Sequence, residues 1–106
     1  MDSILNKLEK ILEERKSASS DQSYVSLLYS NGTSSILEKI REESEEVINA
    51  VNDEGRNEII HEVADLWFHL LVLLRHEDIE IQEIESELAK RFGVSGHDEK
   101  ASRDSK

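Results

Sequence analysis

The stretch EIIHEVADLWFHLLVLLRH, residues 58–76, decides the fold of this chain. At about 100° per residue, as in an α-helix, its apolar side chains cover most of the circumference. The remaining strip is narrow and polar, and it holds Glu58, Glu62, Asp65, His69 and His76. A helix that is apolar nearly all round belongs in a core, where an unpaired carboxylate is very costly. We therefore expect Glu62 and Asp65 to face a partner from elsewhere in the chain.

The composition favours a small all-helical protein. The chain has 106 residues, no proline and only 4 glycines, and no alternating strand pattern competes with the helical periodicity. Cysteine is absent, which excludes disulfides and thiolate metal sites. The net charge of −11 argues against nucleic acid or an anionic membrane as the partner, because both attract basic surfaces. Neither a signal peptide nor a membrane span is predicted, so we expect a cytoplasmic protein.

Apolar residues at helical spacing predict three long helices besides the one at 58–76. They cover about residues 2–16, 33–52 and 79–92, while residues 24–29 are interpreted as a helical turn or a short helix. Short connections between the long helices favour an antiparallel four-helix bundle. We expect a single all-α domain over residues 1–93, followed by a polar tail over residues 94–106.

Local signals predict where these helices begin and end. Asn31-Gly32 is typical of a helix stop in which glycine takes a positive φ, and the turn at 53–55 separates the two central helices. Short polar side chains are expected to cap the helix starts, and the candidates are Asp2 or Ser3, Thr33 or Ser35 with Glu38, and Asn57.

The 58–76 helix has more apolar perimeter than the other helices can easily cover. Trp67 and Phe68, which continue this perimeter, are interpreted as core residues. The surplus predicts a homodimer with this helix near the two-fold axis, whereas a monomer with an unusually broad apolar stripe is the alternative.

Two acidic pairs share the same spacing on the two central helices. Glu43 and Glu46 lie three residues apart, as do Glu62 and Asp65, and side chains at this spacing are neighbours on a helix. Antiparallel packing would bring all four carboxylates together at the margin of the core, where like charges raise one another's pKa. A divalent cation relieves this repulsion. Oxygen ligands without cysteine favour Mg²⁺ or Mn²⁺.

The spacing alone is a weak motif, because the chain is so acidic that carboxylate pairs at this distance arise by chance. Solvent-facing carboxylates are the alternative, and they account well for Glu42 and Glu45. They account less well for Glu62 and Asp65, whose helix is otherwise apolar. His61 and His69 are interpreted as structural histidines rather than as metal ligands.

A resemblance to a known family strengthens the metal-site hypothesis. Residues 42–46, EESEE, followed by residues 62–65, EVAD, match the EExxE…ExxD pattern of the all-α nucleotide pyrophosphohydrolases, the MazG-like superfamily. Within it the chain resembles the phosphoribosyl-ATP pyrophosphatases, which act second in histidine biosynthesis. The resemblance rests on four segments that cover nearly the whole chain: ILEERK, SYVSLLYSNGTSSILEKIREESEEV, EIIHEVADLWFHLLVLL and SGHDEKASR. Arg41 departs from the family, which often has glycine there, and so does the Ser44-Glu45 pair.

The resemblance implies hydrolysis of phosphoribosyl-ATP to phosphoribosyl-AMP and pyrophosphate. It implies that Mg²⁺, or Mn²⁺, is held by the four carboxylates and that Glu42 or Glu46 is the general base. The residues expected to bind substrate are Lys39, Ser23 and Tyr24, together with Lys100 and Arg103 of the tail, which substrate would order.

Two alternative functions stay open at this point. The first is a house-cleaning pyrophosphohydrolase that acts on another nucleoside triphosphate. The second is a non-enzymatic helical dimerisation module whose carboxylates only keep it soluble.

Overall fold

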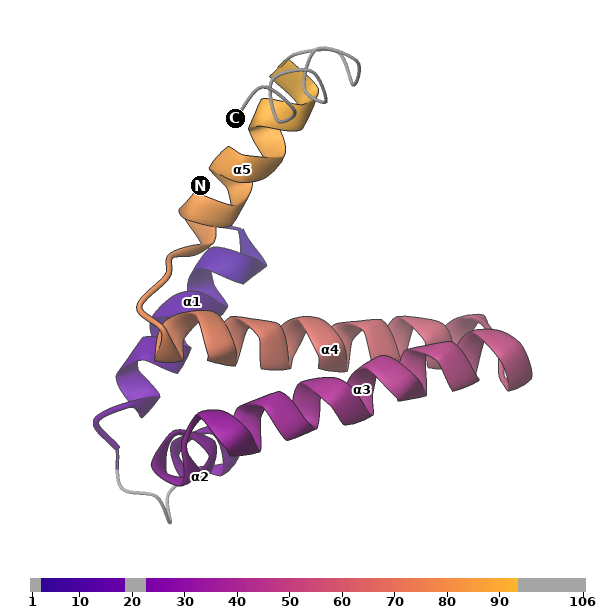
Figure 1. Cartoon of the computed structure of the whole chain (residues 1–106), viewed down its shortest axis with the longest axis horizontal. Helices are drawn as coiled ribbons and strands as arrows, with labels where there is room; N and C mark the ends of the chain where they lie inside the picture. The colour runs from indigo at the N-terminus through magenta and orange to yellow at the C-terminus, as the bar shows by residue number, and fades with distance from the viewer. Residues whose placement is uncertain (1–2, 19–22, 94–106) are drawn as a thin grey trace.

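The computed structural model describes residues 3–18 and 23–93, and within them it contains five helices and no strand (Figure 1). The helices are α1 (Ile4–Arg15), α2 (Tyr24–Asn31), α3 (Thr33–Asp53), α4 (Arg56–His76) and α5 (Ile81–Gly93). The predicted all-α class is confirmed. The predicted tail at 94–106 lies outside the described residues.

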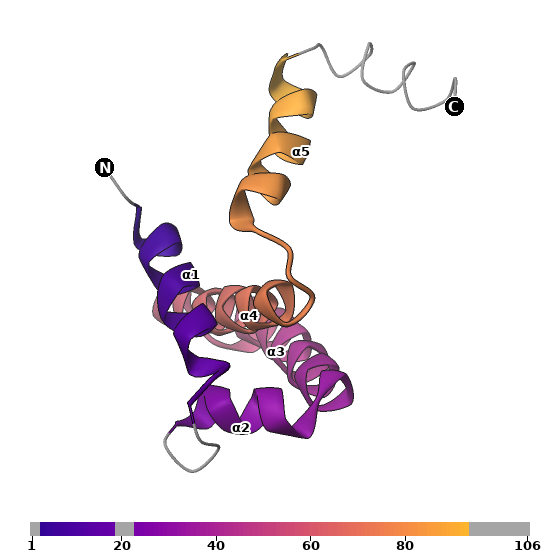
Figure 2. The same ribbon diagram turned by 90° about the vertical axis from the view of Figure 1, so that its left-hand side faces the viewer.

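The fold is built on α3 and α4, two helices of 21 residues each that lie side by side in antiparallel directions (Figures 1 and 2). The connection between them is too short for any other arrangement, since α3 ends at Asp53 and α4 begins at Arg56. α1 and α2 pack against one end of this pair, and the buried apolar residues gather there: Leu12, Val25, Leu28, Ile36, Leu71, Val72 and Ile81. At the other end no further helix of the described chain covers the pair, so Ile48 and Ile60 remain exposed.

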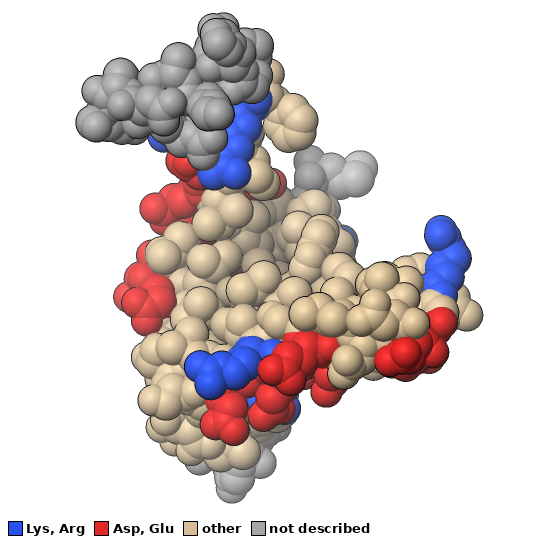
Figure 3. Space-filling model, turned by 45° about the vertical axis from the view of Figure 1, so that its right-hand side comes forward, with Lys and Arg blue, Asp and Glu red and all other residues tan. Residues whose placement is uncertain are grey.

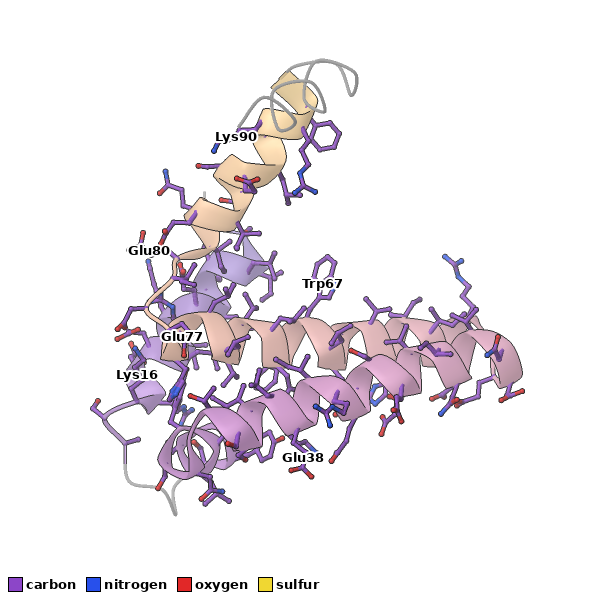
Figure 4. The ribbon with its side chains drawn as sticks, viewed as in Figure 1. Lys16, Glu38, Trp67, Glu77, Glu80 and Lys90 are labelled. Carbon is purple, nitrogen blue, oxygen red and sulfur yellow. The ribbon has the colours of Figure 1, made fainter. Side chains whose placement is uncertain are left out.

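The predicted four-helix bundle is not closed within one chain. α5 projects away from the α3–α4 pair instead of packing along it (Figures 1 and 2). Among residues 81–92 of α5 only Ile81 is buried, and Ile84 and Leu88 are exposed. Trp67, interpreted from the sequence as a core residue, is 53% exposed and points away from α3 into the open angle below α5 (Figure 4). Phe68 does pack against the core, as predicted.

Some predicted helix ends are confirmed and others are wrong. Ser3 caps α1 by accepting a hydrogen bond from the Asn6 amide at 3.2 Å. Gly32 has a φ of +92° and ends α2, as the Asn31-Gly32 pair predicted. The predicted caps of the two central helices are wrong: α3 and α4 begin after Gly32 and Gly55, which offer no capping side chain, so neither Thr33, Ser35 nor Asn57 is a cap.

Candidate metal centre

Three of the predicted carboxylates meet where α3 and α4 face each other. Glu43 and Glu46 of α3 and Glu62 of α4 each offer a carboxylate oxygen, and these three oxygens lie within 4.8 Å of one another. We call these three residues the carboxylate cluster. The antiparallel packing of the two helices creates it, because Glu43 and Glu46 come from neighbouring positions on one helix and Glu62 faces them from the other.

Asp65, the fourth predicted ligand, belongs to an adjoining group. Its carboxylate, that of Glu62 and the ring of His61 offer atoms within 4.8 Å of one another, so Glu62 is common to both groups. The His61 Nε2 atom lies 3.5 Å from Asp65 Oδ2 and 3.6 Å from Glu62 Oε1. His61 was interpreted from the sequence as structural, yet it is exposed and faces the candidate site. Its i, i+4 spacing to Asp65 was the signal that could have indicated this.

Glu43 is the most enclosed member of the carboxylate cluster. The residue is only 7% exposed, and its Oε2 atom is buried without a hydrogen-bond partner among the described residues. Burial, followed by the negative charges of Glu46 and Asp65, raises the pKa of the Glu43 carboxyl. A buried carboxylate oxygen without a donor is uncommon, and a bound ion or water can satisfy such an oxygen.

Glu62 carries the clearest sign of crowding between like charges. A side-chain hydrogen bond with Glu46, then partial burial, then the negative charge of Glu46 raise the pKa of the Glu62 carboxyl to about 7. Two carboxylates can share a hydrogen bond only if one of them is protonated. A pKa of about 7 means that this proton is lost near neutral pH, which leaves the carboxylate open to a cation.

The predicted phosphate-binding lysine lies beside the cluster on α3. Lys39 Nζ is 3.3 Å from Glu42 Oε1, so the proposed base and the proposed phosphate ligand form an ion pair. Glu42 is exposed and is not one of the three residues of the carboxylate cluster. Glu42 therefore lies beside the cluster, paired with Lys39, and not within it.

The remaining predicted site residues have different surroundings. Ser23 caps α2, because its hydroxyl accepts from the Ser26 amide at 3.0 Å. The Tyr24 hydroxyl lies 2.8 Å from His69 Nε2 and close to Lys39, whose charge and hydrogen bond partly oppose the rise that burial causes in the pKa of Tyr24. Lys100 and Arg103 lie outside the described residues.

Comparison with known proteins places this chain in a family. Residues 5–92 match the family model described as phosphoribosyl-ATP pyrophosphohydrolase. The chain belongs to this family. It is 60% identical over 103 residues to a phosphoribosyl-ATP pyrophosphatase of Vesicomyosocius okutanii subsp. Calyptogena okutanii, covering 97% of this chain and 98% of the relative. It is also 58% identical to the enzyme of that name from Ruthia magnifica subsp. Calyptogena magnifica, with the same coverage, and 47% identical to that of Hydrogenovibrio crunogenus, covering 94% and 92%.

The carboxylate cluster could hold a metal ion, and a cation would offset the further negative charge that a polyphosphate substrate brings to an acidic site. The donor set fits a hard divalent ion: the three cluster residues and Asp65 offer only oxygen, and the orphaned Glu43 oxygen is ready to coordinate. Figure 3 shows Asp and Glu side chains in a band along one margin of the α3–α4 pair, below a broad surface that lacks charged residues.

Proposed function

We propose that this chain hydrolyses phosphoribosyl-ATP to phosphoribosyl-AMP and pyrophosphate, the second step of histidine biosynthesis, with Mg²⁺ as its cation. The single observation that carries the metal is the buried Glu43 oxygen without a partner, set among carboxylates that repel one another. The substrate follows from the family and from relatives that match over nearly their full length. A non-enzymatic dimerisation module does not account for a cluster that is held together at the expense of stability.

The proposed ligands of the cation are Glu43, Glu46, Glu62 and Asp65, and Mn²⁺ would satisfy the same oxygens. When bound, such a cation neutralises oxygens of the triphosphate and stabilises the charge that develops on the leaving pyrophosphate. The protein contributes the placement. Glu43 is buried on α3, while the packing of α4 against α3 places Glu62 and Asp65 on the neighbouring helix.

The carboxylates and the lysine have separate tasks in the reaction. We assign proton removal from the attacking water to Glu46 or Glu42, since both are exposed at the edge of the site where water enters. Glu42 already balances the charge of Lys39, whereas Glu46 lies within the cluster. Lys39 is proposed to pair with phosphate oxygens, and Lys100 and Arg103 of the tail to do so when substrate binds.

The second copy of the chain is the proposed partner of the open side of α4. A groove of about 350 Å³ runs between α1, α4 and α5, and its apolar lining includes Leu5, Trp67, Leu70, Ile81, Ile84 and Leu88. Several of these side chains are more than one-third exposed, and together they extend over both α4 and α5. Packing of α5 from one copy into the groove of the other would bury both surfaces in a self-complementary way. Light scattering should then give twice the mass of the chain, and a monomer would contradict the proposal.

No helix in the described part of the chain combines the length and the hydropathy that a membrane span requires. We propose that the enzyme works in the cytoplasm, as expected for an enzyme of histidine biosynthesis.

A comparison of substrates tests the proposed reaction. Pyrophosphate release is measured with phosphoribosyl-ATP, ATP, dUTP and dCTP, each with Mg²⁺ and with a chelator. We expect the highest kcat/KM for phosphoribosyl-ATP and no release with the chelator. A higher kcat/KM for a free triphosphate would show instead the house-cleaning activity, and full activity without a divalent cation would contradict the metal site.

A further inference from the structure

One nitrogen donor lies among the oxygen donors of the candidate site. His61 stands in the second turn of α4, directly before Glu62 and four residues before Asp65. Side chains four residues apart lie on the same face of a helix, so the ring of His61 and the carboxylate of Asp65 are neighbours. The same spacing brings together the two metal-binding histidines of helical H-E-x-x-H sites, and residues 61–65 of this chain read HEVAD. The spacing therefore suits two ligands of one ion.

The distances at His61 suit a metal ligand better than a hydrogen bond. Its Nε2 atom lies 3.5 Å from Asp65 Oδ2 and 3.6 Å from Glu62 Oε1. An N–H···O bond is usually about 2.7–3.2 Å long, so neither carboxylate holds the ring by a good hydrogen bond. Two donor atoms that each lie about 2.1 Å from one ion are about 3.0 Å apart at octahedral angles and about 3.4 Å apart at tetrahedral angles. The two separations at His61 are close to the tetrahedral value.

A second, independent observation indicates a ligand at this place. Glu62 belongs both to the group with His61 and to the carboxylate cluster, where the Oε2 atom of Glu43 is buried without a hydrogen-bond partner among the described residues. Glu43 is more than nine-tenths buried, and a bound ion would satisfy its free oxygen. The Glu62 side chain is 12% exposed and that of His61 is 64% exposed. His61 is therefore the donor that an ion arriving from solvent can meet first.

We propose that His61 is a nitrogen ligand for the cation at Glu62 and Asp65, and that it raises the affinity of the site for divalent transition metals. The inference rests on the proposed function for the presence of a cation. Mg²⁺ prefers oxygen ligands and gains little from an imidazole, whereas imidazole nitrogen is a good ligand for Zn²⁺. Mn²⁺ prefers oxygen more than Zn²⁺ does and stands between the two ions. His61 thus widens the choice of metal beyond the one that the carboxylates alone would favour.

Metal titrations without nucleotide test this role. Calorimetry on the whole chain at about pH 7.5, where most imidazole is unprotonated, gives dissociation constants for Zn²⁺, Mn²⁺ and Mg²⁺. His61→Ala should weaken Zn²⁺ binding by about tenfold or more, Mn²⁺ binding less, and Mg²⁺ binding by no more than about twofold. A His61 that only pairs its positive charge with the carboxylates would act differently, because its loss would tighten the binding of all three ions. That result, an equal weakening for all three, or no change would overturn the proposal.

Two further variants separate a ligand from a general effect of substitution. His61→Glu replaces nitrogen by oxygen, so it should retain Mg²⁺ binding and lower the affinity for Zn²⁺ relative to Mg²⁺. His76→Gln is the control on the same helix, since the His76 ring lies 3.0 Å from the Thr33 hydroxyl and stacks on Tyr29. It should leave all three dissociation constants unchanged. A loss of Zn²⁺ binding in His76→Gln as large as in His61→Ala would mean adventitious binding to histidines, and would contradict the proposal.

Imidazole ¹⁵N spectra of the whole chain identify the ligand directly. Stoichiometric Zn²⁺ should shift the Nε2 resonance of His61 far more than the resonances of His69 and His76. A bound ion that leaves the His61 ring unshifted would overturn the proposal. Neither measurement needs a substrate, so the absence of hydrolysis with every nucleotide would count against the proposed function and not against the ligand. If none of the three ions binds to the wild-type chain, the proposed metal site and the role of His61 are both wrong.

Discussion

Two groups of charged side chains border the core of this protein. In one of them opposite charges pair within the chain, whereas in the other like charges face one another. At the junction of α1 and α4, Arg75 is 9% exposed and donates from Nη1 to Glu13 at 2.9 Å and from Nη2 to the Ile79 carbonyl at 2.7 Å. Glu9 accepts from the Ile81 amide at 2.8 Å and lies 3.8 Å from Arg75. Here the chain supplies both signs of charge, and the result is a clamp between α1, α4 and the start of α5.

The carboxylate cluster has the same border position, but the basic side chain that faces it, His61 at 3.6 Å from Glu62, is a cation only when protonated. The three carboxylates of the cluster face one another, and Lys39 is engaged by Glu42 at its edge. The repulsion appears as raised pKa values of Glu43 and Glu62. The α1–α4 junction also holds a buried atom without a hydrogen-bond partner among the described residues, Arg75 Nε, but the charge of Arg75 is balanced there by Glu9 and Glu13. Since most buried charges in proteins are paired, the difference supports the proposed ligand at the cluster and a stabilising role for the clamp.

The largest expected effect comes from removing one charge of the cluster. Glu62→Gln keeps the shape of the side chain but loses a metal ligand, so kcat/KM should fall by about a hundredfold or more. The same change removes repulsion, and Tm without Mg²⁺ should rise. Pyrophosphate release and thermal melts measure the two effects on one preparation.

Glu45→Gln is the matched control, since Glu45 is an exposed carboxylate on the same stretch of α3 outside the cluster. It should leave both activity and Tm unchanged. If Glu62→Gln were as active as Glu45→Gln, the cluster would be no more than a set of surface charges.

Breaking the clamp should lower the stability of the protein and leave its activity unchanged. Arg75→Met leaves Glu13 and the Ile79 carbonyl without their donor, and we expect the free energy of unfolding to fall by about 2 kcal/mol. This value lies below that for a fully buried pair, because the Glu13 side chain is half-exposed. Urea titration measures it, while kcat/KM of the folded enzyme should be unchanged. If Arg75→Met lost activity and kept its stability, the clamp would serve function and not stability, contrary to this expectation.

An exposed ion pair of α5 gives the control for the clamp. Lys90 Nζ lies 3.4 Å from Glu87, with both side chains more than half exposed. Lys90→Met should change the free energy of unfolding by less than about 0.5 kcal/mol.

The contrast also explains which features were predictable from the sequence. Helix positions follow from apolar periodicity, and the short turn at 53–55 forces α3 and α4 to be antiparallel. Local sequence therefore brought Glu43, Glu46 and Glu62 together. The direction of α5 was not predictable, because Arg75 and Glu9 fix its start through contacts between residues more than 60 positions apart in the chain. For the same reason Trp67 was interpreted as core, since nothing local indicated that α5 would leave it exposed.

The smallest effect, a few degrees in Tm, should appear in the pH dependence of stability. The folded pKa of Glu62, about 7, lies above its ordinary value of 4.5, so ionisation of this group costs stability in the folded state. The stabilisation that comes from the protonated Glu62 carboxyl is fully present below about pH 4.5 and is lost as pH rises through 7. With a chelator, Tm should therefore decline between pH 5 and about 8. Asp78 does not interfere, because its hydrogen bond from Lys16 lowers its pKa below 3.8 and it stays ionised throughout.

Mg²⁺ should compete with the proton at this site, so that its stabilising effect grows from pH 6 to pH 8. In Glu62→Gln the decline with pH should be smaller and the response to Mg²⁺ weaker, because the proton and the cation lose the same carboxylate. An increase in Tm by Mg²⁺ that is equal at pH 6 and pH 8 would mean that the ion binds elsewhere. The carboxylate cluster and the Arg75 clamp would then differ only in how well their charges are paired, and the proposal of a ligand at the cluster would be wrong.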